Sequence, residues 1–488
     1  MCDDISTYLG PKGYTIYKDA LTVKEQELIR KELTVSPFVP KNSMVPPTSF
    51  PVYRESKNKF YLPRFYGMEN YGEPDDIKIG DGKDIDLEFK GSLRDFQKPI
   101  VETYVKSAKK GNCGLLAIHT GAGKTVMALN IISRIKKKTL IIVHKEFLLR
   151  QWIERIEQFL PDAKVGKIQA NILDIEGKDI VIAMLQSLSM KSYPAEVFED
   201  FGLTIVDEVH RIGAEVFSRS LFKAVTKYML GVSATVNRKD GLTKVIKMFI
   251  GDVIYKKERK GENKVLVKGI NYEVDDDGFN EIEYNYRGQV HYTKMIKKLC
   301  EYNRRSEFIL EVLKDQLKEK TEQQIMILGH NKNLLKYLFD AIHHRNIASV
   351  GYYVGGMKEK DLKISESKKV IIGTYAMAEE GLDIKTLTTL LMATPRVDVT
   401  QAVGRILRKK DHEAVVIDII DSHAIFQRHW DKRRRFYQKQ KFNIKITNTK
   451  NYKNNIWNNL FKDGKKVKAK APKIKSDLVL TGKCLILE

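Results

Sequence analysis

The sequence contains few cysteines and no long apolar run. Only four of its 488 residues are cysteines, and Cys2, Cys113, Cys300 and Cys484 lack the spacing of metal ligands. Such scattered cysteines are typical of free thiols in a reducing compartment. No segment approaches the roughly 20 apolar residues that span a bilayer, and the first residues lack the pattern of a secretory signal peptide. We therefore expect a cytoplasmic protein without a transmembrane segment.

Acidic side chains are outnumbered by basic ones. The chain carries 85 lysine and arginine residues against 62 aspartate and glutamate residues, a formal net charge of +23. The imbalance is uneven, because residues 1–90 hold 13 basic and 15 acidic side chains whereas residues 420–488 hold 18 and 5. This excess indicates a polyanionic partner such as nucleic acid. The alternative is that the basic segment only keeps the chain in solution.

The N-terminal 90 residues differ in composition from the rest. Eight of the 13 prolines lie in the first 74 residues, and aromatic side chains recur between Phe50 and Tyr66. This composition predicts short strands and turns around one amphipathic helix near Leu21–Leu33. We expect a small α+β accessory module. Because its net charge is only −2, contacts with transcription or replication proteins are as plausible as contacts with duplex DNA.

Short apolar runs alternate with helical patterns in two stretches of the chain. Several runs are continuously apolar, which is typical of strands buried on both faces of a parallel sheet. The first stretch has expected strands at Gly114–Ile118, Thr139–Val143, Asp179–Ala183, Leu203–Val206 and Tyr228–Val232. The second has them at Ile325–Leu328, Ile347–Tyr353, Val370–Ile372, Leu387–Met392 and Ala414–Ile419. The pattern predicts an α/β protein with two parallel-sheet lobes of similar size.

These patterns divide the sequence into five parts. We expect an accessory module at 1–90, a first lobe at 91–255, a connection with a helical start at 256–300, a second lobe at 301–445 and a basic tail at 446–488. Within residues 428–475, which are rich in basic residues and asparagine, we expect one helix and a loose arm.

A glycine-rich loop follows the first expected strand of the first lobe. Residues 119–125 read His-Thr-Gly-Ala-Gly-Lys-Thr and precede an apolar helical run. Such glycines allow a tight turn that points backbone N–H groups at phosphate oxygens, beside the positive end of a helix. Ile118 stands where the strict form of this pattern has its first glycine. Lys124 would contact the β- and γ-phosphates of ATP, and the Thr125 hydroxyl would bind Mg²⁺. The expected ATP-binding residues of the loop are Gly121, Ala122, Gly123, Lys124 and Thr125.

Acidic and hydroxyl residues follow two further strands of the same lobe. Asp207 and Glu208 open the tetrapeptide Asp-Glu-Val-His after Leu203–Val206. A carboxylate at the C-terminal end of a parallel strand, facing the phosphate loop, is placed to bind Mg²⁺, and we assign this role to Asp207. Glu208 would polarise the water that attacks the γ-phosphate. Ser233 and Thr235 follow the next strand and would couple this site to the second lobe.

The second lobe carries candidate residues of its own. Arg405 and Arg408 stand three positions apart, so they share one face of the expected helix. From there they could reach negative charge that develops on a γ-phosphate, a contribution of about 10³–10⁵ in rate. Gly381 and Asp383 lie in the segment that begins at Thr374. They would link the state of the nucleotide to closure of the lobes.

Taken in order, these motifs resemble those of superfamily 2 helicases over about residues 90–440. The glycine loop resembles motif I and the Asp-Glu-Val-His sequence resembles the DEVH box, or motif II. Residues 233–235, 374–383 and 401–408 resemble motifs III, V and VI. The resemblance implies two tandem RecA-like lobes that bind ATP and Mg²⁺. It further implies that Gln97 reads adenine, that Gln401 contacts the nucleotide and that His210 couples the two lobes.

The resemblance also implies contacts with a nucleic-acid strand. By motif analogy, the residues that contact its phosphates are Lys145, Gln186, Ser187, His330, Asn331 and Thr374. Such contacts do not depend on base sequence and are sensitive to salt. Bound ATP would favour closed lobes and hydrolysis would reopen them, so each cycle would advance the protein along the strand. The resemblance implies 3′→5′ movement, and we expect a monomer.

Within the superfamily, residues 233–242 resemble the XPB-like branch, which includes the phage UvsW helicase and the transcript-release helicases of poxviruses. The Arg-Glu-Asp unwinding element of that branch falls on Arg238, Lys239 and Asp240, with lysine in place of the glutamate. The aromatic N-terminal module and the basic helix at 433–437 resemble forms carried by large cytoplasmic DNA viruses. The resemblance implies a role in viral transcription, recombination or DNA repair, in the cytoplasm, a viral factory or the virion.

The sequence leaves several functions open. The Arg238–Asp240 segment favours DNA as the substrate, but proteins with this type of motif II also act on RNA. An ATP-driven translocase that moves on a duplex without separating its strands would use the same residues. A scaffold that binds nucleic acid without hydrolysing ATP is disfavoured by the intact Lys124, Glu208, Arg405 and Arg408.

Overall fold

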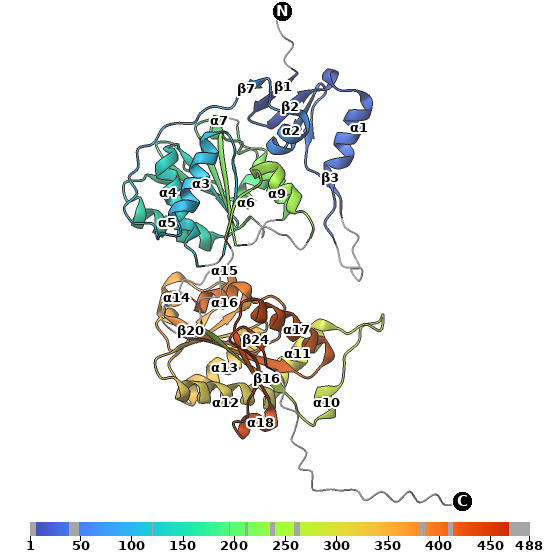
Figure 1. Ribbon diagram of the computed structural model, residues 1–488, viewed down its shortest axis with the longest axis vertical. Coiled ribbons are helices and arrows are strands. Elements are labelled where there is room, and N and C mark those ends of the chain that lie inside the picture. Colours follow the sequence, from blue (N-terminus) through green and yellow to red (C-terminus); the bar gives the residue numbers. More distant parts are fainter. Residues whose placement is uncertain are drawn as a thin grey trace, which may run out of the picture. The chain divides into compact units, whose positions relative to one another are not determined.

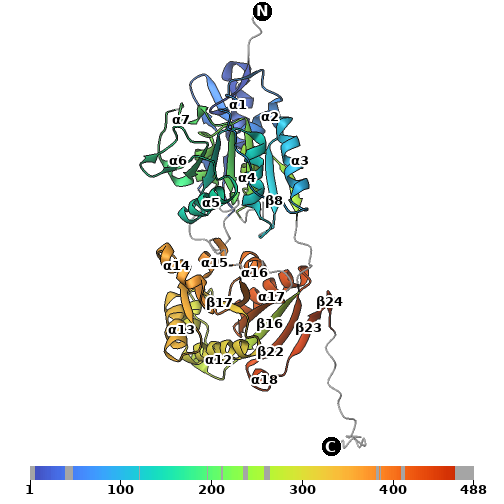
Figure 2. The same cartoon turned by 90° about the vertical axis from the view of Figure 1, so that its left-hand side faces the viewer.

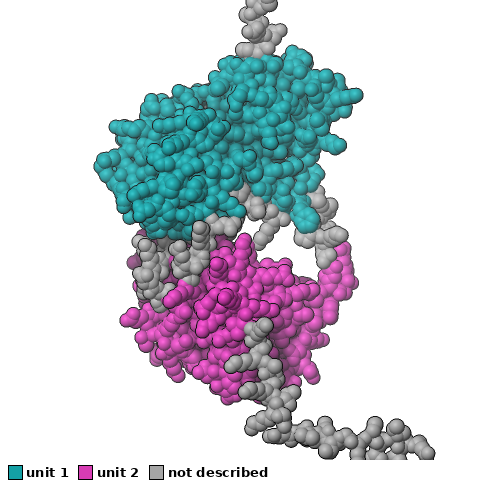
Figure 3. Space-filling view, viewed as in Figure 1, with its two compact units in different colours: residues 1–259 teal, residues 260–488 magenta. Residues whose placement is uncertain are grey.

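The chain folds into two compact units, Met1–Arg259 and Lys260–Glu488, drawn in teal and magenta in Figure 3. The computed structural model describes residues 6–38, 48–119, 121–194, 196–209, 213–234, 240–257, 264–380, 384, 386–407 and 413–467. No helix within these ranges is both long enough and apolar enough to cross a membrane.

The first unit is built around an eight-stranded sheet (Figures 1 and 2). Its strands are β8 (Gly114–Ile118), β9 (Thr139–Val143), β10 (Val165–Gln169), β11 (Ile172–Leu173), β12 (Ile180–Met184), β13 (Leu203–Asp207), β14 (Tyr228–Ser233) and β15 (Val253–Lys257). They lie in the order β11-β10-β12-β9-β13-β14-β8-β15. All neighbouring strands are parallel except β10 and β11, which are antiparallel. The predicted parallel sheet is thus confirmed.

Helices cover both faces of this sheet. They are α3 (Lys98–Lys109), α4 (Lys124–Ile135), α5 (Glu146–Phe159), α6 (Leu185–Met190), α7 (Glu196–Glu199), α8 (Ala214–Leu221) and α9 (Thr243–Ile250). Apolar residues of α3, α4 and α5 form one core with Leu116 and alternate residues of the neighbouring strands. Residues of α6, α8 and α9 form a second core with Leu115 on the opposite face. Neighbouring strand residues therefore supply both cores, as expected for buried parallel strands.

A small five-stranded sheet precedes the large one. It consists of β1 (Thr7–Gly10), β2 (Gly13–Tyr17), β5 (Arg54–Glu55), β6 (Lys59–Leu62) and β7 (Asp76–Ile77), in the order β5-β6-β2-β1-β7. The remaining elements are a 3₁₀ turn (Lys18–Ala20), α1 (Val23–Glu32), β3 (Thr34–Val35), β4 (Phe50–Pro51) and α2 (Arg64–Tyr71). The helix predicted near Leu21–Leu33 is confirmed as α1. It begins with a capping box, in which Thr22 and Glu25 each bond to the backbone N–H of the other.

The small sheet packs directly against the large one. Tyr14 and Phe60 belong to the same apolar core as Leu115 and Phe249. The buried Arg64 guanidinium donates to the carbonyl oxygens of Thr226 and Lys227 at 3.0 and 2.9 Å. Because a buried guanidinium must find such acceptors to offset its lost hydration, this contact fixes α2 to the loop before β14.

The second unit has a nine-stranded sheet. Its strands are β16 (Val265–Tyr272), β17 (Gln324–Gly329), β18 (Val350–Tyr353), β19 (Val370–Thr374), β20 (Leu387–Met392), β21 (Ala414–Asp421), β22 (Asn443–Asn448), β23 (Asn458–Lys462) and β24 (Lys465–Lys466). They lie in the order β18-β19-β17-β20-β21-β16-β22-β23-β24. Pairing is parallel from β18 to β22 and antiparallel from there to β24. In the described part of the chain, the two large sheets are thus RecA-like and stand in tandem, and the small five-stranded sheet precedes them.

The helices of the second unit follow the same alternation. They are α10 (Asp277–Asn280), α11 (Tyr292–Glu301), α12 (Asn303–Glu319), α13 (Lys332–His344), α14 (Glu359–Glu366), α15 (Tyr375–Glu380), α16 (Thr400–Ile406), α17 (Ala424–Lys439) and α18 (Thr449–Lys453).

Four strands of this sheet were not predicted. The stretch 256–300, expected to be a connection with a helical start, contains β16, which lies between β21 and β22. The expectation of one helix and a loose arm within 428–475 was wrong beyond α17, because β22, α18, β23 and β24 fold there and continue the sheet. Residues 468–488 lie outside the described part of the chain.

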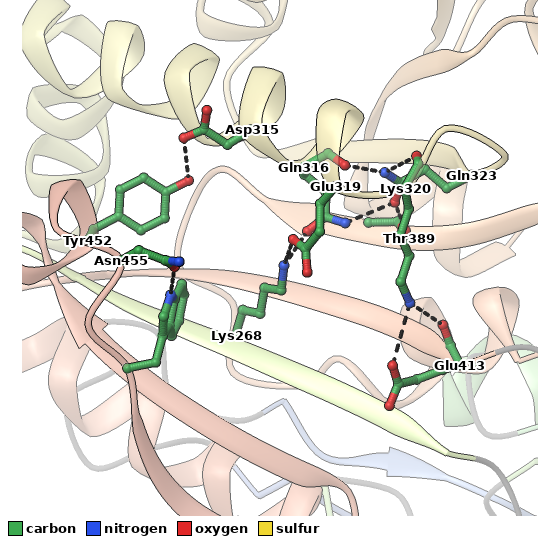
Figure 4. A network of polar contacts seen from close by, with 11 residues as sticks. Lys268, Asp315, Gln316, Glu319, Lys320, Gln323, Thr389, Glu413, Tyr452 and Asn455 are labelled. Carbon is green, nitrogen blue, oxygen red and sulfur yellow. Dashed lines mark hydrogen bonds and ion pairs between the residues drawn. The ribbon is translucent and has the colours of Figure 1, made fainter.

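A buried polar network joins β16 to α12 (Figure 4). Lys268, which is only 6% exposed, donates to Gln316 Oε1 at 2.7 Å and forms an ion pair with Glu319. Gln316 in turn bonds to Gln323, whose Oε1 accepts from Thr389 on β20 at 2.7 Å. Burial lowers the pKa of Lys268, an effect that the Glu319 carboxylate opposes. The network explains how a lysine can occupy the middle of a buried strand.

Candidate active site

The glycine-rich loop joins β8 to α4. Gly121 and Gly123 have φ angles of 84° and 81°, in the left-handed region that glycine adopts without strain. A Cβ atom on Gly123 would lie 2.6 Å from Gln97 Nε2, so a larger residue would also collide there. Helix α4 begins at Lys124, the next residue. The loop and the 12-residue helix therefore have the geometry that binds phosphate through backbone N–H groups. Thr120 lies outside the described residues.

The side chain of Gln97 is hydrogen-bonded to the glycine-rich loop. This side chain is buried, and its Nε2 donates to the carbonyl oxygen of Ala122 at 2.7 Å. Its Oε1 accepts from the backbone N–H of Arg94 at 2.9 Å. Both ends of the amide thus bond to backbone groups of the first unit. The predicted adenine contact of Gln97 stays a prediction.

Two carboxylates lie next to the loop. Asp207 is the last residue of β13 and Glu208 follows it. The Lys124 ammonium lies 2.7 Å from Glu208 Oε1, with both side chains at least four-fifths buried. Strand β14 lies between β13 and β8 and ends at Ser233, which is buried. The loop, the two carboxylates and Ser233 therefore follow three adjacent parallel strands at one edge of the sheet.

Trp152 holds Asp207. The indole Nε1 of this fully buried residue of α5 donates to Asp207 Oδ2 at 3.0 Å. Burial raises the pKa of Asp207 above its ordinary value, and the neighbouring Glu208 raises it further. Lys124 and the bond from Trp152 oppose this rise. This role of Trp152 could not be predicted from local sequence, because its partner is 55 positions away and only the fold brings the two together.

The backbone at Glu208 is strained. Its φ angle is 49°, although it is not a glycine, and its N–H donates to the carbonyl oxygen of Val232 at 2.9 Å. A left-handed conformation at such a residue costs about 1–3 kcal/mol and is found mainly where function requires it. Here the conformation turns the Glu208 carboxylate toward Lys124. His210, predicted to couple the lobes, lies outside the described residues.

Three further predicted residues of the first unit lie at the same sheet edge, namely Lys145, Gln186 and Ser187. Lys145 and Gln186 follow β9 and β12, which are neighbours in the sheet. Gln186 is exposed and donates to the carbonyl oxygen of His144 at 3.0 Å, whereas Ser187 Oγ accepts from the N–H of Ala170 at 2.9 Å. Asp240 Oδ1 accepts from the N–H of Leu242 at 3.1 Å. Thr235 and Arg238 lie outside the described residues.

In the second unit, the predicted contacts also follow strand ends. His330 comes after β17, and its Nδ1 lies 2.8 Å from Thr394 Oγ1. Asn331 caps α13, since its Oδ1 accepts from the N–H groups of Asn333 and Leu334. Thr374 ends β19 and accepts from the N–H of Met377 at 3.4 Å. Burial, with a smaller effect of Arg396, lowers the pKa of His330 to about 4, so this ring is neutral at pH 7.

The candidate arginine of this unit lies on α16. Gln401 and Arg405 both belong to this helix, and Arg405 Nε donates to the carbonyl oxygen of Ala378 at 3.2 Å. Gly381, Asp383 and Arg408 lie outside the described residues. The roles of these residues across the two units stay predictions.

Comparison with known proteins identifies the family. Residues 90–238 match the family model described as "Type III restriction enzyme, res subunit". The "Putative ATP-dependent RNA helicase L396" of Acanthamoeba polyphaga mimivirus is 34% identical over 473 residues, which span 94% of this chain and 91% of that protein. The "DNA 3'-5' translocase XPB2" of Sulfurisphaera tokodaii is 26% identical over 369 residues, 67% of this chain and 81% of that protein.

Among solved structures, the crystal structure of T4 UvsW covers 88% of this chain and 96% of its own, with a TM-score of 0.32 and 17% identity. The relatives at higher identity, together with the phosphate loop and the Asp207–Glu208 pair, establish the assignment. The chain belongs to the superfamily 2 helicases, ATP-dependent helicases and translocases, and is related to those of large DNA viruses.

Proposed function

We propose that this protein uses ATP hydrolysis in its first unit to move 3′→5′ along DNA, and that it does so in viral transcript release, recombination or repair. The observation that carries the proposal is the 2.7 Å contact between Lys124 and Glu208 beside the glycine-rich loop. A mobile ammonium and a carboxylate at one phosphate-binding loop are the pair that hydrolysis of a phosphoanhydride needs.

In this proposal each residue of the site has one task. Lys124 exchanges Glu208 for the β- and γ-phosphates when ATP binds, because phosphate oxygens carry more negative charge. Glu208, released from the ion pair, accepts a proton from the attacking water. Thr125 and Asp207 would hold Mg²⁺, which would supply positive charge to the phosphates. Trp152 keeps Asp207 oriented and favours its ionised form, the form that binds a cation.

In this proposal the second unit supplies further residues that contact the nucleotide and the nucleic-acid strand. Arg405 and Arg408 stabilise charge on the γ-phosphate, and Gln401, Gly381 and Asp383 link the nucleotide to lobe closure. Phosphates of the strand are contacted by Lys145, Gln186, Ser187, His330, Asn331 and Thr374. Arg238 and Asp240 contact the nucleic acid as parts of the unwinding element. In support, Thr374 is the last residue of β19, and Lys145, Gln186, Ser187, His330 and Asn331 lie just beyond strand ends. In parallel α/β sheets, ligands bind at this edge.

An RNA helicase is the second candidate. The mimivirus relative, which is the more similar of the two proteins described above, is named as an RNA helicase, whereas the archaeal relative is named as a DNA translocase. The Arg238–Asp240 segment favours DNA, as the sequence analysis argued.

Strand displacement on tailed duplexes tests the proposal. DNA and RNA duplexes with a 3′ or a 5′ single-stranded tail are offered with ATP and Mg²⁺. We expect displacement, or at least stimulated ATP hydrolysis, with the 3′-tailed DNA duplex. ATP hydrolysis stimulated by DNA without displacement would indicate a duplex translocase. Displacement or ATP hydrolysis with RNA alone would show that RNA, not DNA, is the substrate. Faster displacement of duplexes with 5′ tails would show that the movement is 5′→3′.

A further inference from the structure

A short turn between α10 and α11 exposes two tyrosines. Tyr284 pairs with Val290 in an isolated antiparallel bridge, and the N–H of His291 donates to the carbonyl oxygen of Glu283 at 2.7 Å. We call residues 283–291 the tyrosine turn. In Figure 1 this yellow-green segment extends outward from the body of the second unit.

Asn285 fixes the conformation of the tyrosine turn. Its Oδ1 accepts from the N–H groups of Arg287 and Gln289 at 2.9 and 3.0 Å. Its own N–H donates to the carbonyl oxygen of Gln289 at 2.7 Å, and its carbonyl oxygen accepts from Gly288 at 3.0 Å. Gly288 has a φ of 68°, which glycine adopts without strain. Four hydrogen bonds within five residues hold the tip of the turn in one shape.

The base of the turn is anchored in the unit. Ile282 and Val290 pack against its apolar core. The Glu283 N–H contacts the sulfur of the buried Met295 at 3.2 Å, and Lys298 of α11 donates to the carbonyl oxygen of Glu281 at 2.8 Å. The tip is therefore presented on a fixed support.

At the tip, aromatic side chains face solvent. Tyr286 is 75% exposed and Tyr284 is 55% exposed. The Arg287 guanidinium lies 5.3 Å from the centroid of the Tyr286 ring, a cation–π distance. Neither ring is part of the apolar core of the second unit, and exposed aromatic side chains often mark a binding surface.

We propose that the tip of the tyrosine turn stacks on an unpaired base of a single nucleic-acid strand, with Arg287 contacting the adjacent phosphate. This inference rests on the proposed function. An aromatic ring with a neighbouring guanidinium is the combination that holds single strands without base specificity. Residues 260–488 also hold 44 basic and 29 acidic side chains, a net charge of +15, so the second unit as a whole attracts a polyanion.

Binding to short strands tests the inference. The full chain is titrated with oligo(dT), oligo(U) and an abasic strand of the same length. We expect Tyr286→Ala to weaken binding to at least one base-bearing strand by about 5- to 150-fold, and Tyr286→Phe to retain it. On the abasic strand, wild type and Tyr286→Ala should bind equally. Tyr61→Ala is the matched control, because Tyr61 of the first unit also carries a cation, Lys12, over its ring.

The salt dependence separates the two side chains of the tip. Tyr286→Ala should leave the slope of log Kd against log salt unchanged, whereas Arg287→Ala should reduce it by about 1. Equal binding of Tyr286→Ala and wild type to every strand would overturn the inference and indicate a protein partner for the turn. An equal loss with Tyr61→Ala would also overturn it. Should wild type bind no strand at all, the proposed function itself fails.

Discussion

The two units both carry carboxylates paired with cations where parallel strands end, but the cations differ. In the first unit, Lys124 makes one contact with Glu208 at 2.7 Å. In the second, Asp421 ends β21 and accepts two bonds from the Arg305 guanidinium, at 2.6 and 2.9 Å, with both residues fully buried. A bidentate guanidinium is geometrically fixed, whereas an ammonium can exchange one anion for another.

This difference indicates which unit carries the chemistry. Arg305 also donates to the carbonyl oxygen of Ala393 at 2.8 Å. Its side chain therefore connects α12 with the ends of β20 and β21 and stabilises the fold. Among the described residues, the Lys124 ammonium is bonded to one carboxylate, that of Glu208, beside a loop with the geometry to bind phosphate. The ion pair of the first unit is therefore suited to be broken by a ligand, and that of the second unit to persist.

The largest expected effect comes from removing the lysine. Lys124→Ala should lower the rate of ATP hydrolysis by at least about 10²-fold, because the charge that meets the phosphates is lost. Steady-state phosphate release measures it. Lys98→Ala removes a lysine of α3 whose partner is the exposed Asp95, and it should hydrolyse ATP like wild type. Equal rates of ATP hydrolysis for Lys124→Ala and Lys98→Ala would contradict the view that the ion pair of the first unit serves ATP hydrolysis.

The next effect is on stability and concerns the second unit. Arg305→Leu leaves Asp421 buried without its partner and should lower the free energy of unfolding by about 3–5 kcal/mol. The double variant with Asp421→Leu should recover most of this loss, since neither charge remains. Urea unfolding followed by circular dichroism measures both. Arg345→Leu, which removes an exposed pair with Glu307, should change little. A double variant as unstable as the single one would contradict a structural role for the pair.

A smaller effect is expected at Trp152. Trp152→Phe removes the bond to Asp207 and should slow ATP hydrolysis at pH 7 by about tenfold, the size of a hydrogen bond to a charged group. Because this bond lowers the pKa of Asp207, its loss should move the acidic limb of the pH–rate profile to higher pH. The control is Trp457→Phe, which loses a bond to Asn455 in the second unit. An unshifted limb would show that Trp152 does not act through Asp207.

The smallest effect concerns pH and the second unit. His330 has a pKa of about 4 when folded and an ordinary value near 6.5 when unfolded. Between these values the unfolded chain binds a proton that the folded chain does not, so stability should fall as pH drops from about 6.5 towards 4. His330→Gln should lose less stability between pH 7 and pH 5, measured by urea unfolding. The same pH dependence in wild type and variant would exclude His330 as its source.

Much of the fold could be predicted because buried parallel strands leave apolar runs. The bounds of β8, β9 and β20 coincide with the predicted ones. Strand β16 escaped prediction because Lys268 and Gly269 interrupt its apolar run, and the lysine is tolerated only through partners on α12. Strand β22 escaped because it is largely polar and half-buried, and its pairing with β16 depends on tertiary structure.

The candidate site, like the fold, could be predicted only where local sequence encodes it. The glycine loop and the Asp207–Glu208 pair follow from local sequence, because their chemistry needs these residue types next to strand ends. The bonds from Trp152 to Asp207 and from Arg305 to Asp421 join residues 55 and 116 positions apart. No local pattern encodes such pairs, and they emerge only once the strands are ordered in the sheet.

The central claim is that Glu208, which forms an ion pair with Lys124, becomes the base for ATP hydrolysis once the phosphates of ATP replace it as the partner of the lysine. The most direct measurement compares wild type and Glu208→Gln for nucleotide binding and for ATP turnover with a single strand present. The account predicts that the variant binds ATP at least as tightly as wild type, because Lys124 is no longer paired with a charge, while turnover falls by about 10²-fold or more. Turnover equal to that of wild type would contradict the account.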